Sequence, residues 1–290
     1  MRHYLLLHFA VLLAGFTGVF GKVITLNEGL LVWYRVLFAS ILLFFIVKVI
    51  RKSSRLHTRE IVEIVKVGML LTVHWVFFYA SIKYSNVSIG VVCYCLCGFF
   101  TSVFKPLIEK AKFQPTELVL SILSVSGIVL IFHFDAVYRT GIVLGVVSAA
   151  LGALYTIFNA RIVKKYDNLT INYYQMLGGT AGLGVLLPVY LHFFPVERFL
   201  PSLSDIFYLV LLALFCTVGL YFALVETMKK VPVFTINLSF NLEPIYSILL
   251  AFLFFNESKE VNFAFYAGLA IIIISVVLQT LKSLPASSNW

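Results

Sequence analysis

Residues 30–50 read LLVWYRVLFASILLFFIVKVI, an apolar run of the length that crosses a bilayer as one helix. A helix rises about 1.5 Å per residue, so about twenty residues span the roughly 30 Å of hydrocarbon. Comparable runs recur along the chain and are separated by short polar breaks. We place ten spans, at 4–24, 30–50, 65–85, 87–107, 118–134, 141–162, 171–194, 206–227, 231–255 and 263–281. The sequence therefore predicts an all-α integral membrane protein with ten transmembrane helices.

The composition supports a membrane protein and excludes several other classes. Hydrophobic residues make up 61% of the chain and charged residues 12%, against roughly 45–50% and 25% in soluble domains. The surplus apolar surface must face lipid. The net charge of +9 is not gathered in a water-facing domain or an aromatic RNA-binding motif, so we expect no nucleic-acid partner. The four cysteines lie in apolar runs without zinc-site spacing, so we expect no metal and no cofactor.

The basic residues predict how the chain lies in the membrane. Short cytoplasmic loops hold an excess of lysine and arginine. Most of the 22 basic residues fall on one side if the N-terminus is inside. Both termini are therefore expected in the cytoplasm, and the expected location is the bacterial cytoplasmic (inner) membrane.

The chain also contains a weak internal duplication. Residues 22–35 run parallel to 162–175 at an offset of 140, and Gly127 to Leu130 match Ser275 to Leu278 at an offset of 148. The second offset also pairs Glu109 with Glu257. The difference between the offsets requires insertions between the blocks.

The layout of the spans suggests how the two copies are oriented. Each half contains five spans, and an odd number makes the second copy enter the membrane from the opposite side. We therefore expect two inverted five-helix repeats, at 1–135 and 136–290. Such halves can exchange conformations and expose a central site alternately to each side.

The ninth span ends in a run from Asn241-Leu242-Glu243-Pro244-Ile245-Tyr246 to Phe254-Phe255-Asn256-Glu257. This run resembles the EamA-type permeases of the drug/metabolite transporter superfamily. Pro244, Glu257 and Gly268 stand where the family's last hairpin has its proline, glutamate and glycine, and Arg35 stands at the family's early arginine position. The first half departs from the pattern, with Leu96 in place of the proline. The resemblance implies a ten-helix exporter or importer of metabolites with a cavity between its halves.

Two charged residues within the spans are the main candidates for transport. Burying such a side chain costs at least about 2.5–3.5 kcal/mol, so it usually faces a cavity or a partner. We expect Arg35 to attract an anionic group of the solute, and Glu243 to be a proton-linked or polar substrate contact. The alternative is that the two residues only lock helices together. Their repeat counterparts, Gln175 and Cys95, are neutral.

Other polar and aromatic residues extend the candidate substrate site. Asn237 and Asn241 stand four residues apart, on one helical face near Pro244. The third span contributes a strip of His74, Trp75 and Tyr79, for which packing is the alternative role. The second half contributes Tyr155, Asn159, Tyr174 and Gln175.

The sequence as a whole predicts a carrier. We expect a monomer or a homodimer that moves a small metabolite or drug-like solute by alternating access, with proton coupling left open. One alternative is an integral membrane enzyme acting on lipid, but the dispersed histidines do not form the compact site it needs, so we expect no enzyme. A non-transporting membrane scaffold is the other alternative.

Overall fold

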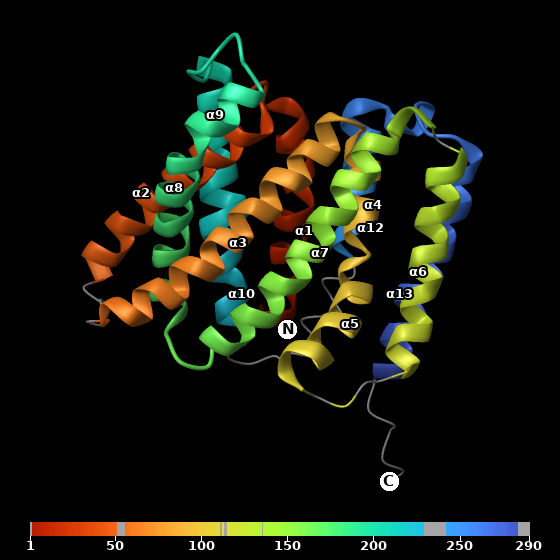
Figure 1. Cartoon of the computed structure of the whole chain (residues 1–290), viewed down its shortest axis with the longest axis horizontal. Helices are drawn as coiled ribbons and strands as arrows, with labels where there is room; N and C mark the ends of the chain where they lie inside the picture. Colours follow the sequence, from red (N-terminus) through yellow and green to blue (C-terminus); the bar gives the residue numbers. More distant parts are fainter. Residues whose placement is uncertain are drawn as a thin grey trace.

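The computed structural model describes residues 2–50, 56–110, 112, 115–134, 136–228 and 242–283, and these residues form helices joined by short connections. Figure 1 shows the helices packed as one bundle, with α6 and α13 side by side at one edge. The start of α1 and the end of α13 lie toward the same side of the bundle (Figure 1).

The first half of the chain supplies six α-helices. They are α1 (Arg2–Val23), α2 (Glu28–Ile50), α3 (Thr58–Lys83), α4 (Val87–Tyr94), α5 (Cys97–Glu109) and α6 (Pro115–Phe134). The second half begins with a short 3₁₀ turn, η1 (Ala136–Tyr138). It continues with α7 (Arg139–Ile162), α8 (Asn168–Phe193), α9 (Leu203–Ala213), the π-helical η2 (Leu214–Gly219), α10 (Leu220–Met228), α12 (Glu243–Phe255), η3 (Glu257–Lys259) and α13 (Phe263–Ser283).

The helices confirm that the protein is all-helical and built for a membrane. Within the described residues, seven helices are long and apolar enough to cross a bilayer. Shorter apolar helices, at Ile122–His133, Glu243–Phe255 and Phe263–Ser275, lie where the fifth, ninth and tenth spans are expected. One expected boundary is wrong. The third helix starts at Thr58 rather than at residue 65, because Glu60 accepts a hydrogen bond from the backbone N–H of His57 and caps the helix start.

Two spans are interrupted near their middle. In the fourth span, a turn at Cys95-Leu96 separates α4 from α5. In the eighth span, η2 winds as a π-helix between α9 and α10. Interruptions of this kind inside apolar helices are frequent at functional sites. The sequence had indicated neither of them.

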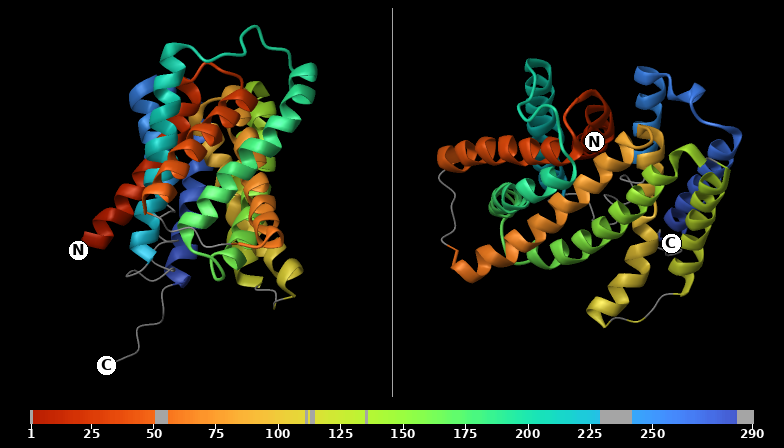
Figure 2. Two further views of the ribbon diagram at one scale, coloured as in Figure 1. Left: turned by 90° about the vertical axis from the view of Figure 1, so that its left-hand side faces the viewer. Right: turned by 45° about the horizontal axis from the view of Figure 1, so that its top comes forward.

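The helix packing links the two halves along their whole length. Helix α3 lies against α7 and α8, and α1 lies against α10 and α12. Helix α2 packs on α8, α4 on α12, and α6 on α13. Figure 2 shows α2, α8, α3 and α7 next to one another on one side of the bundle.

Candidate functional site

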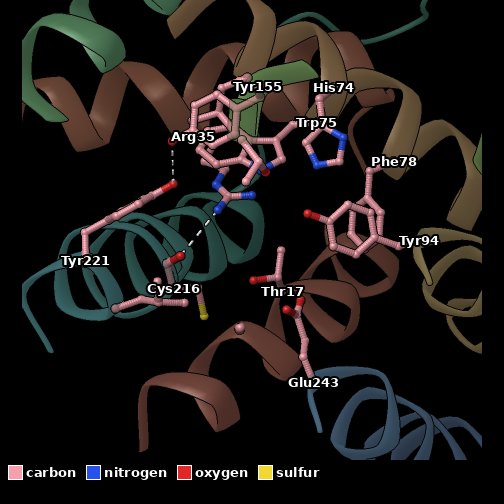
Figure 3. A pocket seen from close by; sticks show the side chains of 14 residues that line it. Thr17, Arg35, His74, Trp75, Phe78, Tyr94, Tyr155, Cys216, Tyr221 and Glu243 are labelled. Atoms are coloured by element: carbon pink, nitrogen blue, oxygen red, sulfur yellow. Dashed lines mark hydrogen bonds between the residues drawn. The ribbon is translucent and has the colours of Figure 1, made fainter. Parts of the chain in front are cut away.

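A cavity of about 150 Å³ lies inside the bundle, and helices of both halves line it. Its walls come from α1, α2, α3, α4, α7, η2, α10 and α12. The lining residues are Ala14, Thr17, Arg35, Leu71, His74, Trp75, Phe78, Tyr94, Tyr155, Thr156, Cys216, Leu220, Tyr221 and Glu243. The two interrupted spans both contribute, through Tyr94 at the end of α4 and Cys216 within η2 (Figure 3). Aromatic rings, one cation and one carboxyl group face the cavity.

Neutral groups hold Arg35 in place. Its Nη1 donates a hydrogen bond of 2.8 Å to the Tyr79 hydroxyl, and its Nε donates one of 3.1 Å to the Thr217 hydroxyl. Its Nη2 donates to the Cys216 carbonyl at 3.3 Å. The Trp75 ring covers one face of the guanidinium, with 3.7 Å between the ring centroid and Cζ. This stacking provides a cation–π attraction, which strengthens when both groups are desolvated.

Within the described residues, no carboxylate neutralises the positive charge of Arg35. The side chain is 2% exposed, and within the described part of the chain no carboxylate lies within 4.0 Å of its guanidinium. An arginine has five N–H donors. These three hydrogen bonds leave two of the donors unused among the described residues. A buried cation with spare donors beside a cavity is suited to bind an anionic group.

Glu243 lies on the opposite side of the cavity from Arg35. Figure 3 shows its carboxyl group near Thr17, away from the guanidinium. Glu243 is the first residue of α12, and Pro244 follows it in the first turn. Unpaired backbone N–H groups at a helix start favour a carboxylate. The two charged side chains thus face one cavity without forming an ion pair in the described residues, so a simple Arg35–Glu243 lock is not what holds these helices together.

His74 joins the cavity wall to α7. Its Nδ1 lies 2.8 Å from the Ser148 carbonyl oxygen and 3.0 Å from the Ser148 hydroxyl. The ring also packs against Tyr94, with 5.3 Å between centroids. A Cβ added at Gly152 would lie 2.9 Å from Tyr94 and 3.3 Å from His74, so this part of the wall needs a glycine. His74 therefore has both a packing role and a face toward the cavity.

The structure gathers part of the expected site and separates the rest. Arg35, His74, Trp75, Tyr155 and Glu243 line the cavity. Three other candidates stand behind this wall. Tyr79 supports Arg35, and Gln175 accepts a 3.4 Å hydrogen bond from the Tyr155 hydroxyl while donating a 2.8 Å one to Asn159.

The remaining candidates do not belong to the described site. Tyr174 packs with the apolar cluster of Ile64, Ile162 and Ile171 instead of lining the cavity. Asn237 and Asn241 lie outside the described residues. In the part of the chain that the structure describes, no three His, Cys, Asp or Glu side chains could share a metal ion.

Several lining residues were missed because they are uncharged. Thr17, Tyr94 and Tyr221 face the cavity, although nothing in their local sequence separates them from packing residues. A signal for Tyr94 existed in the duplication, because it precedes Cys95, which the offset of 148 places over Glu243. No sequence feature indicated the π-helical η2, which places Cys216 and Thr217 next to Arg35.

Comparison with known proteins places the chain among transporters. A family model described as the EamA-like transporter family matches residues 1–133 and 139–281. An uncharacterized transporter of Clostridium kluyveri is 26% identical over 69% of this chain and 65% of the relative. The uncharacterized transporter YdfC of Bacillus subtilis is 28% identical over 61% of this chain and 58% of the relative. The chain thus aligns with less than two thirds of the length of both relatives.

A third relative and a solved structure extend this likeness. An uncharacterized transporter of Archaeoglobus fulgidus is 25% identical over 73% of both chains. A crystal structure of another protein superimposes with a TM-score of 0.65 over 98% of this chain and 99% of that chain. Its sequence identity is 15%, so this likeness shows the fold alone.

Proposed function

Because this chain belongs to the EamA-like transporter family and is an integral protein of the bacterial cytoplasmic membrane, we propose that it is a secondary carrier. It moves a small metabolite or drug-like solute across the bilayer by alternating access. One observation carries this proposal. A buried arginine faces a cavity between the two halves, and no carboxylate among the described residues pairs with it.

Arg35 is the residue that binds the solute's anionic group. Trp75 covers one face of the guanidinium, and Tyr79, Thr217 and Cys216 use three of its donors. An anionic group therefore approaches the remaining N–H groups from within the guanidinium plane, where hydrogen bonding to arginine is strongest. The cavity of about 150 Å³ limits the part of the solute held there to a few heavy atoms.

Glu243 is the second contact, and it is the group that links transport to protons. A carboxyl group across the cavity from Arg35 can accept a hydrogen bond from the solute when ionised and donate one when protonated. An ionisable side chain deep in a membrane protein usually serves such a role. This role separates a proton-linked carrier from a carrier that only equilibrates its solute.

Matching helix starts support an inverted repeat as the basis of alternating access. Helices α2 and α8 start 140 residues apart, and each follows a cap residue, Asn27 or Asp167, whose side chain accepts a backbone N–H. Helices α3 and α9 start 145 residues apart, and both have a capping box. Helices α6 and α13 start 148 residues apart. The offsets grow along the chain, as the two sequence offsets of 140 and 148 require.

The helices of the fourth and ninth spans support the same repeat. Helices α5 and α12 both have 13 residues, and each is followed by a residue in the left-handed region, Lys110 or Asn256. In this register the counterpart of Glu109 is Phe255, two residues before the Glu257 that the sequence offset suggested. The helix packing supports the repeat as well. If each helix is replaced by its counterpart in the other half, the α3–α7 contact becomes the α10–α1 contact, and the α6–α13 contact maps onto itself.

The names of the family and of the relatives point to transporters rather than to an enzyme or a passive scaffold. Proteoliposomes loaded with a panel of small radiolabelled carboxylates and phosphates, assayed with and without a pH gradient, test the carrier function. We expect saturable flux of at least one solute.

Replacing Glu243 tests the proton link in the same vesicles. We expect Glu243→Gln to retain solute exchange and to lose the acceleration that a pH gradient gives, because the amide cannot carry a proton. If the Glu243→Gln protein responds to the pH gradient as the wild type does, Glu243 does not link transport to protons. Absence of flux for every solute in a well-inserted wild-type protein would count against a carrier.

A further inference from the structure

Glu257 lies away from the cavity, and its carboxylate is fully buried and saturated with hydrogen-bond donors. Its exposed fraction is 0%, and it accepts a 2.8 Å bond from the Lys22 ammonium. The other oxygen accepts 2.7 Å and 2.9 Å bonds from the hydroxyl and backbone N–H of Ser88. The Val87 N–H adds a fourth bond, of 3.0 Å. Four donors around one buried carboxylate make its position well defined.

These bonds connect three helices from the two halves of the chain. Glu257 follows α12, Lys22 is in the last turn of α1, and Val87 and Ser88 form the first turn of α4. The carboxylate therefore occupies the N-terminus of α4, where unpaired N–H groups and the helix dipole favour a negative charge. We call this side of the bundle, where α1 ends and α2 begins, the α1–α2 end.

Both helices that meet at Glu257 reach the cavity at their other ends. Helix α4 has 8 residues and finishes at Tyr94, and α12 has 13 residues and begins at Glu243. Tyr94 and Glu243 both line the cavity. Because α4 and α12 each run from the Glu257 contact to the cavity, a displacement at Glu257 moves the cavity wall as well.

Two further carboxylates tie the halves together at the same end. Asp205 of α9 is 1% exposed and accepts bonds of 2.7 Å and 2.8 Å from the backbone N–H and the hydroxyl of Thr25. Glu28 at the start of α2 accepts a hydrogen bond from the Tyr190 hydroxyl of α8. The α1–α2 end thus has three carboxylates whose hydrogen bonds cross between the halves.

From this geometry we propose that Glu257 is the latch of the α1–α2 end and the residue that couples its opening to the cavity. When the latch is made, α4 and α12 are held together and the cavity is shut on this side. When it breaks, the N-terminus of α4 loses its counter-charge, and α4 and α12 separate. The inference rests on the alternating access proposed above, and it names the contact that must be made and broken in each cycle.

The accessibility of Cys216 tests the latch without any transported solute. Cys216 lines the cavity, so a small, charged, membrane-impermeant methanethiosulfonate can reach it only through an open end. The reagent is added to sealed vesicles of either orientation, and mass spectrometry of the peptide that contains Cys216 gives the labelling rate. In Glu257→Gln we expect labelling from the α1–α2 side to rise by about ten-fold or more, which corresponds to a shift of about 1.4 kcal/mol. Labelling from the other side should not rise.

Matched variants separate the latch from general damage. Glu260→Gln is the control, because Glu260 is 45% exposed and lies 4.0 Å from the same Lys22 ammonium. We expect it to label as the wild type does. Ser88→Ala removes one donor and leaves the carboxylate in place, so it should give a smaller rise than Glu257→Gln. It also keeps the test available if Glu257→Gln does not fold.

Each outcome decides for or against the latch. A rise confined to the α1–α2 side supports it, whether or not a transported solute has been found. An equal rise from both sides shows that the bundle has only loosened and overturns the proposal. Wild-type labelling in folded Glu257→Gln and Ser88→Ala proteins overturns it as well. Failure of the carrier proposal appears instead as absent flux in the wild type, which this labelling does not measure.

Discussion

The two ends of the bundle use similar residues in different surroundings. At the α1–α2 end, Asp205 and Glu257 are buried and each accepts short bonds from the other half. At the opposite end, where α7 ends and α8 begins, the charged pair that crosses between the halves is exposed. The Lys165 and Glu63 side chains, joined by a 2.8 Å bond, are 52% and 43% exposed.

Each end has one capping box, so the two ends can be compared directly. Asp205 caps α9 and also bonds Thr25 at 2.7 Å and 2.8 Å, while Glu60 caps α3 and accepts a 3.3 Å bond from the Tyr166 hydroxyl. Charged groups gain far more from hydrogen bonds in a buried site than at an exposed one. The described conformation is therefore held more strongly at the α1–α2 end than at the α7–α8 end.

The largest expected effect comes from removing the buried cap. Asp205→Ala leaves the Thr25 and Ser202 donors without their acceptor, and losing these hydrogen bonds costs about 1–3 kcal/mol. Glu60→Ala at the other end should cost less than about 1 kcal/mol. Reversible unfolding in mixed detergent micelles measures both losses. Equal losses for the two variants would erase the difference between the ends.

The smallest expected effect comes from the exposed pair at the α7–α8 end. Lys165→Met should shift the unfolding midpoint slightly at low salt and leave it unchanged at physiological salt, where exposed charges are screened. The hydrogen bond to Glu63 raises the pKa of Lys165. The pair's contribution is therefore complete below the pKa of a free lysine and is lost as the pH rises through the raised value. A large loss at physiological salt would show that this end is also tightly closed.

The fold could be predicted because lipid imposes a simple pattern. The ends of the apolar runs lie within about three residues of most of the described helix ends. The interruption of the fourth span could not be predicted, because Cys93-Tyr94-Cys95-Leu96-Cys97 contains neither proline nor glycine. The start of α12 at Glu243 had a signal in Pro244, which stands in its first turn.

The candidate site could be predicted only where it is charged. Arg35 and Glu243 stood out because charge inside a span is costly, and both line the cavity. Thr17, Tyr94 and Tyr221 looked like ordinary packing residues, since only the folded bundle decides which face of a helix borders a cavity. The neutral partners of Arg35 come from segments 44 and about 180 residues away, a distance that no local pattern reveals.

Solute flux through an Arg35 variant tests the central claim most directly. The measurement compares wild-type, Arg35→Gln and Arg139→Gln proteins in proteoliposomes, after insertion is verified. Arg139 is the matched control, because it is an exposed arginine at the start of α7, outside the cavity. We predict that Arg35→Gln lowers flux about 100-fold or more, as expected when a charge-assisted anchor worth about 3 kcal/mol is lost, while Arg139→Gln transports normally. Wild-type flux through a correctly inserted Arg35→Gln protein would contradict the account.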